Sequence, residues 1–177
     1  SGALAFPVEL NNVTGSWFNA EPSDLAGVQI DNGTESSTIS WGSYHDRSSY
    51  TFSGEQGPLE VTDSTPFILG TFEHKNEPIP QGSAITGVSL AVEMFFSNDF
   101  GDSPTQSGIF EFSHNETLNA EMQEVSSCNA GFISCLFGFG WETSEQLVST
   151  PVDDIVMLNQ AISSSEFQLG NQIYSLD

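Results

Sequence analysis

Four short segments of the sequence concentrate the side-chain oxygens that bind hard divalent cations. Asn and Asp beside glycine let the backbone fold back, so that several oxygens can face one centre. None of the four has the Asp-x-Asp spacing with a distal Glu that makes an EF-hand loop sufficient by itself. The segments are Asp31–Glu35, Asn98–Asp102, Glu116–Asn119 and Asp153-Asp154.

Each of these segments can also be explained without a metal ion. Asn98–Asp102 can form a turn whose side chains bond only to its own backbone. Asp153 and Asp154 immediately precede the apolar run Ile155–Leu158. Adjacent carboxylates at a strand start repel each other unless a cation or hydrogen-bond donors hold them. A solvated strand end and a cation site therefore both remain open for this pair.

The histidines do not form a catalytic or zinc signature. His74 has no second histidine and no pair of cysteines nearby in the sequence, so we expect a structural, hydrogen-bonded residue. His45 and His114 lie beside predicted turns and are expected to be exposed. No Ser-His-Asp signature, Gly-rich phosphate loop, His-Glu-x-x-His or Cys-x-x-Cys pair occurs. We expect a protein that is not an enzyme and has no catalytic residue.

The charge of the chain is strongly one-sided. Two basic residues stand against 24 acidic ones, for a formal net charge of −22. Such a surface repels nucleic acids and anionic bilayers, which we exclude as partners. Calcium is the first candidate for relieving the repulsion between carboxylates, because it prefers oxygen ligands. The alternative is an acidic surface that only increases solubility in a salty medium.

The pattern of apolar residues predicts an all-β fold, a two-sheet antiparallel β-sandwich with long end loops and at most one short helix. The long alternating run Ala84–Ser97 is expected to be a central strand with a bulge at Gly87, and Leu118–Val125 is the one candidate for a helical turn. The predicted strands are Gly15–Asn19, Gly27–Ile30, Ser37–Trp41, Ser49–Ser53, Phe67–Phe72, Ala84–Ser97, Gly108–Ser113, Leu147–Thr150, Ile155–Leu158, Glu166–Leu169 and Gln172–Leu176.

The segment Thr65–Pro80 is expected to deliver polar side chains to the edge of a sheet. Its strand Phe67–Phe72 is followed by the polar residues Glu73–Asn76, before Pro78 and Pro80 stop further ladder bonding. A binding site and a strand end that is merely well capped are both compatible with this pattern.

The chain is expected to form one monomeric domain over residues 1–177. No apolar run is long enough to span a membrane. Its Ser1-Gly2 start suggests a module excised from a larger surface protein. Cys128 and Cys135 can form a local disulfide in an exported protein or remain two buried thiols.

Four motifs follow one another along the chain. They are Gly70-Thr-Phe-Glu-His-Lys-Asn-Glu-Pro-Ile79, Phe112-Ser-His-Asn-Glu-Thr-Leu-Asn119, Asp153-Asp-Ile-Val156 and Gly170-Asn-Gln-Ile-Tyr-Ser-Leu176. In this order they resemble the choice-of-anchor K domain family of bacterial surface proteins. The resemblance extends over Trp41–Leu176, and Glu73 stands where that family usually has Thr, which leaves His74 and Asn76 in register.

The chain is also similar to the ligand-binding, or peptide-binding, domain of bacterial repeats-in-toxin (RTX) adhesins. This resemblance implies an extracellular β-sandwich on the bacterial cell surface, which binds Ca2+ and captures a short peptide on a host or neighbouring cell. A calcium ion with an open coordination position would accept a peptide carboxylate. The implied metal-side residues are Glu116, Asn119, Asp153 and Asp154, with Asn98, Asp99 and Asp102 as a second ion loop and His74 and Asn76 on the ligand side.

Two alternatives without catalysis remain open. A calcium-dependent carbohydrate-binding module would also use acidic side chains, together with exposed aromatic residues such as Trp41 or Trp141. A structural spacer stiffened by calcium would need no ligand. The segment Cys128–Trp141, which is both aromatic and Gly-rich, is either an exposed binding loop or one more core strand.

Overall fold

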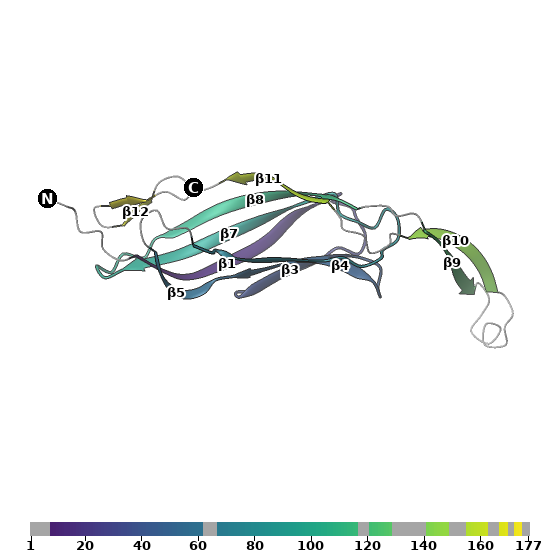
Figure 1. Cartoon of the computed structure of the whole chain (residues 1–177), viewed down its shortest axis with the longest axis horizontal. Helices are drawn as coiled ribbons and strands as arrows, with labels where there is room; N and C mark the ends of the chain where they lie inside the picture. The colour runs from purple at the N-terminus through teal and green to yellow at the C-terminus, as the bar shows by residue number, and fades with distance from the viewer. Residues whose placement is uncertain are drawn as a thin grey trace.

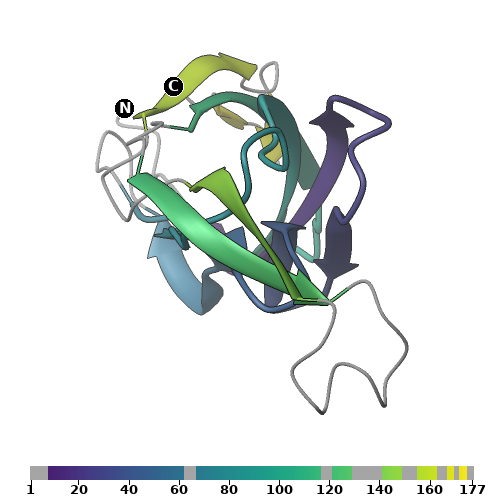
Figure 2. The same ribbon diagram turned by 90° about the vertical axis from the view of Figure 1, so that its right-hand side faces the viewer.

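The computed structural model describes residues 8–61, 67–116, 121–128, 141–148, 155–162, 167–169 and 172–174. All regular elements in these residues are β-strands. They contain no helix long and apolar enough to cross a membrane. Two sheets pack face to face as an elongated sandwich (Figure 1), and Figure 2 looks along it from the end that carries β9 and β10. The predicted two-sheet antiparallel β-sandwich is confirmed.

The two sheets differ in their number of strands. Sheet A has five antiparallel strands and sheet B has four. In order across sheet A these are β11 (Ile155–Ile162), β8 (Thr105–Asn115), β7 (Gly87–Asn98), β1 (Val8–Glu21) and β5 (Gln56–Val61). In order across sheet B they are β2 (Gln29–Asn32), β3 (Ser36–Gly42), β4 (Arg47–Gly54) and β6 (Gly70–Lys75).

Four further strands form two separate antiparallel pairs. They are β9 (Glu121–Cys128) with β10 (Trp141–Val148), and β12 (Phe167–Leu169) with β13 (Gln172–Tyr174). The β9–β10 hairpin projects beyond one end of the sandwich (Figure 1). Cys128 ends β9, but Cys135 lies outside the described residues, so the choice between a disulfide and two buried thiols stays open.

The long strand β1 places its apolar side chains in the core by alternation. Val8 and Leu10 face inward, and the register of β1 shifts between Leu10 and Asn12. Because an extra residue in a strand reverses the alternation, Val13 and Trp17 face inward after the shift. A single strand of fourteen residues therefore contributes buried side chains along most of its length.

The core between the sheets is apolar and rich in aromatic rings. Its members come mainly from β1, β3, β4 and β7, the strands in the middle of the two sheets. The buried apolar residues are Val8, Leu10, Val13, Trp17, Ile39, Trp41, Tyr50, Phe52, Ile79, Ile85, Val88, Leu90, Val92, Met94 and Phe96.

A buried serine connects the sheets by hydrogen bonds. The Ser37 hydroxyl of β3 donates to the carbonyl of Gly15 on β1 at 2.6 Å and accepts from the Gly33 amide at 3.1 Å. The Trp17 indole Nε1 in turn donates to the Ser37 carbonyl at 2.9 Å. Since these groups are buried, the bonds fix the position of β1 against β3 more specifically than apolar contact alone.

Several strand predictions are confirmed and others are wrong. The predicted central strand is β7, which lies in the middle of sheet A. The bulge expected at Gly87 is wrong, because β7 begins there and the register shifts lie in β1. The helical turn expected within Leu118–Val125 is wrong from Glu121 onward. There β9 pairs with β10 along all eight residues, and this pairing overrides the weak helical pattern.

The strand in Thr65–Pro80 lies three residues later than expected. It runs over β6, so Glu73, His74 and Lys75 belong to the strand instead of following it. The reason is its ladder with β4, which continues in regular register to the pair of Ser49 with Lys75. His74 is therefore positioned by a sheet and not by a loop.

Replacing Ser37 by alanine is expected to destabilise the fold. The change removes a hydroxyl that serves buried backbone groups, and leaving such groups unbonded costs about 1–3 kcal/mol. Urea unfolding followed by tryptophan fluorescence measures this difference. The matched control is Ser36→Ala, because the neighbouring Ser36 hydroxyl is exposed. Equal stability of the two variants would contradict this role of Ser37.

Candidate functional site

Five polar or aromatic residues gather at one end of the sandwich, between the two sheets. Sheet B contributes Trp41 from β3, Tyr50 from β4 and His74 from β6. Sheet A contributes His114 from β8 and Glu116, the first residue past that strand. We call this group the histidine end. Tyr50 and His74 are paired in the ladder between β4 and β6, which places their side chains next to each other.

The alternation of β8 turns His114 into the core. Phe110, Phe112 and His114 are two residues apart and share the inner face, and His114 is only 5% exposed. The expectation that His114 is exposed is therefore wrong. The strand continues to Asn115, beyond the predicted end at Ser113, so His114 lies within a strand and not beside a turn.

Both ring nitrogens of His114 are engaged. The Tyr50 hydroxyl lies 2.5 Å from Nδ1, and a carboxylate oxygen of Glu116 lies 3.2 Å from Nε2. Because an ionised carboxylate can only accept, Nε2 carries the proton in this pair, and a neutral ring then accepts at Nδ1 from the Tyr50 hydroxyl. This chain of bonds fixes the orientation of the imidazole and leaves neither nitrogen for a metal ion.

The rings of the histidine end pack closely. The centroid of Trp41 lies 4.8 Å from that of Tyr50 and 5.1 Å from that of His114, both edge-on. His74 lies 5.0 Å from Tyr50 and 5.7 Å from His114. Aromatic rings attract one another at roughly these separations. The site is consequently held by ring packing as well as by hydrogen bonds.

Two polar atoms of this end have no hydrogen-bond partner among the described residues. They are Nε1 of Trp41, a residue with no exposed surface, and Oε1 of Glu116, whose side chain is 13% exposed. An unbonded buried polar atom costs about 1–3 kcal/mol. Because His114 already holds the other oxygen of Glu116, Oε1 is the described atom best suited to a cation or a hydrogen-bond donor.

The sheet register brings together the two strand ends next to which the predicted ligands stand in the sequence. These ligands are Glu116, Asn119, Asp153 and Asp154. The first residue of β11 pairs with the last residue of β8, so the two strand ends are adjacent. In the sequence, Glu116 directly follows β8, and Asp153-Asp154 directly precedes β11. Asn119, Asp153 and Asp154 lie outside the described residues. Their predicted role as metal ligands stays a prediction.

The second predicted ion loop is a turn with internal hydrogen bonds. The side-chain oxygen of Asn98 accepts from the amides of Phe100 and Asp102, each at 3.0 Å. Its amide nitrogen donates to the Asp102 carboxylate, also at 3.0 Å. Asp99 is exposed at the tip. The metal-free alternative accounts for this loop, because its Asn98 oxygen is already occupied by two backbone donors.

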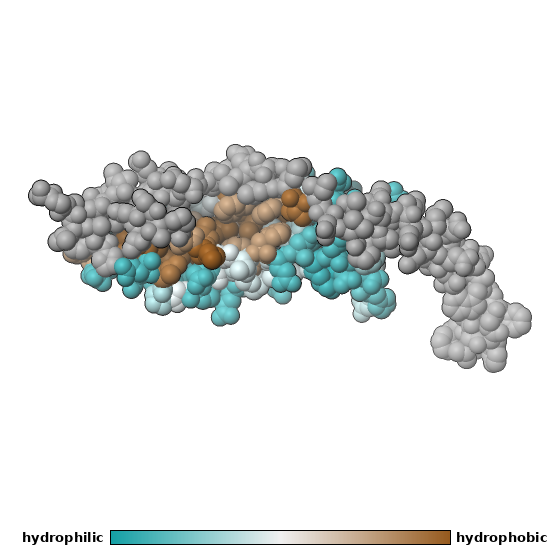
Figure 3. All heavy atoms as spheres, viewed as in Figure 1, coloured by the Kyte–Doolittle hydropathy of each residue, from teal (hydrophilic) through white to brown (hydrophobic). Residues whose placement is uncertain are grey.

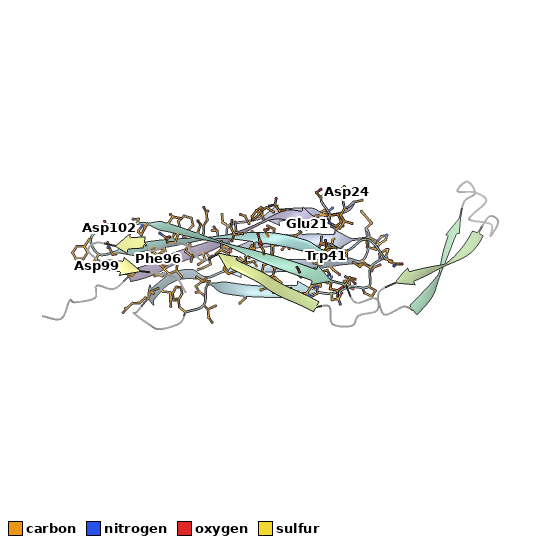
Figure 4. The ribbon with its side chains drawn as sticks, turned by 90° about the horizontal axis from the view of Figure 1, so that it is seen from above. Glu21, Asp24, Trp41, Phe96, Asp99 and Asp102 are labelled. Carbon is orange, nitrogen blue, oxygen red and sulfur yellow. The ribbon has the colours of Figure 1, made fainter. Side chains whose placement is uncertain are left out.

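Glu116 and the Asn98–Asp102 turn lie at opposite ends of the sandwich. Asp99 and Asp102 lie at one end and Trp41 at the other (Figure 4). β8 runs between them over eleven residues, which corresponds to about 35 Å. They therefore cannot share one ion. The described part of the chain contains no group of three or more His, Cys, Asp or Glu side chains arranged to hold a metal.

The residues predicted to contact the ligand differ in their surroundings. His74 is half-buried and stacks on Trp41 with centroids 6.3 Å apart and an angle of 24° between the planes. Asn76 is half-buried just past the end of β6. Trp141 begins β10, and its side chain is outside the description. The suggestion of Trp41 as an exposed platform for a glycan is wrong, because Trp41 is fully buried.

Sequence reasoning missed the part played by Tyr50. A buried tyrosine in an alternating strand normally requires a partner for its hydroxyl. The predicted strand Ser49–Ser53 was sufficient to turn Tyr50 inward, but its partner His114 lies 64 positions further along the chain. Only the packing of the two sheets brings them together.

Replacing Tyr50 by phenylalanine is expected to destabilise the protein by about 1–3 kcal/mol, because it removes the buried hydroxyl bound to His114. Thermal and urea unfolding measure the change. Tyr44→Phe makes the same substitution at a tyrosine that is 90% exposed and should leave stability unchanged. If the two variants are equally stable, the bond between Tyr50 and His114 contributes nothing.

Comparison of the chain with family models, with curated proteins and with solved structures gives no match. The family resemblance described from the sequence motifs is therefore still an expectation, and the functional argument has to rest on the residues of this chain.

Proposed function

We propose that this protein is an extracellular, calcium-dependent binding module of a bacterial cell-surface adhesin and that its ligand is a short peptide. One observation carries the proposal. A buried carboxylate oxygen of Glu116 has no partner among the described residues, and it lies where the ends of β8 and β11 meet. The sequence places three more predicted ligands within four positions of these strand ends, namely Asn119, Asp153 and Asp154.

The charge of the protein supports calcium as the ion. With a net charge of −22, each additional neighbouring carboxylate is repelled unless a cation neutralises it. The two basic residues do not neutralise carboxylates at the histidine end. Arg47 donates to the backbone carbonyls of Gly27 and Ser40, and Lys75 pairs with Glu77 at 2.9 Å. Calcium takes six to eight oxygen ligands, which matches the residue types available.

In this proposal the residues of the chain have different roles. Glu116, Asn119, Asp153 and Asp154 would hold the ion, and His114 would orient Glu116 through its Nε2. A calcium ion with an open coordination position supplies attraction for the carboxylate of a peptide, which this acidic surface would otherwise repel. His74, near the end of β6, and Asn76, just past it, lie on the sheet B side of the histidine end and would contact the ligand.

The same geometry favours binding over catalysis. A general base needs a ring nitrogen or carboxylate that faces a substrate. Both nitrogens of His114 are held by Tyr50 and Glu116, and the ring is buried. This agrees with the lack of any catalytic signature in the sequence. The module is accordingly proposed to act by binding alone.

Calcium is expected to stabilise the protein through Glu116. At a concentration a hundred times its Kd, an ion bound only to the folded state adds about 2.7 kcal/mol, which raises the Tm by about 5–10 °C in a domain of this size. Differential scanning calorimetry with calcium and with a chelator measures the shift. Glu116→Gln should weaken calcium binding at least about tenfold, since it removes one charged ligand.

The control for this experiment is Glu60→Gln, a change of the same kind at an exposed position of β5. It should leave calcium affinity unchanged. An unchanged Tm of the wild type would refute calcium dependence. A calcium effect that survives in Glu116→Gln but is lost in Asp102→Asn would move the ion to the opposite end of the sandwich.

We expect the bound calcium ion to determine which class of ligand the protein binds. On an array of short peptides, the protein should retain peptides with a free C-terminal carboxylate in calcium and release them in a chelator. Amidated peptides of the same sequence form the control, because they cannot coordinate the ion through their end. A parallel glycan array tests the carbohydrate alternative, and calcium-dependent binding to glycans alone would replace the peptide proposal.

A further inference from the structure

The backbone of β6 has hydrogen-bonding groups that point away from its sheet. The amide of Glu55, the residue after β4, donates to the carbonyl of Leu69, the residue before β6. Glu55 and Leu69 are therefore a hydrogen-bonded pair of the ladder. Bonded and non-bonded pairs alternate along an antiparallel ladder. The pairs of Thr71 and Glu73 with β4 are therefore bonded, whereas the N–H and C=O groups of Gly70 and Phe72 face the open edge.

β4 confirms this assignment from its other side. Its residue Gly54 donates to the Glu35 carbonyl, so Gly54 and Phe52 direct their backbone groups toward β3. They are the ladder partners of Gly70 and Phe72. No described residue forms a hydrogen bond to the outward groups of these two β6 residues. β6 thus presents two donors and two acceptors along one edge.

Sheet B is one strand short on the side of β6. The rings of Phe72 on β6 and Phe112 on β8 stack with centroids 5.4 Å apart, so β6 lies over β8. β11 is the next strand of sheet A, and its residue Val156 packs against the core. No described strand of sheet B lies opposite β11. A strand added beside β6 would occupy that position.

The side chains at this edge are apolar and accessible. Phe72 faces the interior with its stacked partner, yet it is 41% exposed, and the neighbouring Ile68 is 68% exposed. Figure 3 shows an apolar band along this side of the sandwich, between the two layers. An apolar side chain from an added strand would cover the Phe72–Phe112 pair and remove its surface from water.

Two other edges carry features that discourage strand addition. β5, at the far edge of sheet A, contains Pro58, which has no N–H to donate, and the charged Glu60. β2, at the far edge of sheet B, has four residues and includes Asp31. Short strands, proline and charge are the usual protection of a sheet edge. β6 also carries exposed charges, at Glu73 and Lys75, but it is longer than β2 and, unlike β5, has no proline.

The charge at the edge of β6 selects the kind of strand. Glu73 is exposed on the outer face of β6, where the side chains of an added strand would lie beside it. Lys75 is already paired with Glu77. An acidic peptide would be repelled by the net charge of −22, and so would a second copy of this chain. A peptide with basic residues on one face and apolar residues on the other fits both faces of β6.

We propose that β6 binds an extended peptide by strand addition, with apolar residues of the peptide on the Phe72–Phe112 pair and basic residues beside Glu73. The inference depends on the proposed function only in that the ligand is a peptide. It requires no calcium and no terminal carboxylate, because backbone pairing supplies the contacts and alternate side chains supply selectivity. In this proposal β6 also determines where the ligand lies on the protein.

The probe for this proposal is a seven-residue peptide of alternating lysine and valine, acetylated and amidated so that it has no carboxylate. It is titrated into the full chain in a chelator by calorimetry, which separates the outcome from that of the calcium experiments. The same peptide with methylated backbone nitrogens at the valines keeps its charge and side chains but cannot pair with β6. Its affinity should be at least about tenfold lower. Equal affinities would overturn the proposal.

Amide hydrogen exchange followed by NMR gives a residue-level readout on the wild-type protein. The probe should slow exchange of the Gly70 and Phe72 amides at least about tenfold, while the amides of Thr71 and Glu73, already bonded to β4, change little. Uniform protection of all four, or of none, would contradict strand addition. Protection of Gly70 and Phe72 without the probe, together with a dimer in sedimentation, would assign the edge to a second copy and overturn the peptide proposal.

Two variants test the side chains. Phe72→Ala should weaken the probe about tenfold, since it removes the ring that the apolar residue covers. Tyr44→Ala, which removes an exposed ring from a loop, is the control and should leave affinity unchanged. Because Phe72 also contacts Trp17 and Tyr50, Glu73→Gln serves as a second variant outside the core. It should weaken the lysine probe, and unchanged affinity in both variants would refute this mode of binding.

Discussion

The rings of Trp17, Tyr50, Phe72 and Phe112 pack against one another across the interface between the two sheets, with centroids 5.1 to 6.4 Å apart in all six pairs. They come from β1, β4, β6 and β8, and thus connect two strands of each sheet. This packing places β6, the last strand of sheet B, over β8. It also turns the following inward residue of β8, His114, toward Tyr50. The histidine end and the β6 edge are both consequences of one cluster of rings.

Charge is the second constraint on this molecule. With two basic residues in the chain, ion pairs cannot neutralise 24 carboxylates. Arg47 is used inside sheet B, where it bonds to the Ser40 carbonyl and hydroxyl and reaches Gly27. The remaining means of compensation are solvent cations, bound cations and basic partners. The proposals on calcium and on a basic peptide are two answers to the same electrostatic condition, at different positions of the sandwich.

The sequence predicted the fold class and most of the strands, because alternation of apolar residues directly reflects a sheet with one buried face. It failed where tertiary contacts determine the outcome. β5 was not predicted, since Gly57 and Pro58 resemble a turn, although an edge strand tolerates them. β9 was expected in part to be a helix, because a short segment with a weak period takes its structure from its ladder partner. The ends of β6 and β8 were set by pairing with neighbours and not by local residue preference.

The candidate site was predictable only in part for the same reason. Glu116 could be proposed from its residue type and neighbours, but its hydrogen bond to His114 depends on the exact length of β8. Tyr50 and Trp41 could not be proposed as part of that end, since their contacts with His114 cross from one sheet to the other. Alternation gives the direction of each side chain within its strand. The relative position of two sheets is additional information that a single sequence does not contain.

β6 relates the two candidate surfaces without making them one site. In an extended strand, successive residues alternate both in the face of their side chains and in the direction of their backbone groups. For this reason Gly70 and Phe72 offer their backbone groups to an added strand while the Phe72 ring remains on the core side. His74 is the next residue of this set, and its ring contacts Tyr50 and His114. A peptide that follows β6 toward Lys75 therefore approaches the histidine end, where Glu116 lies. Under the two proposals, strand pairing and calcium binding would contribute to affinity through different atoms, so each could be lost without the other.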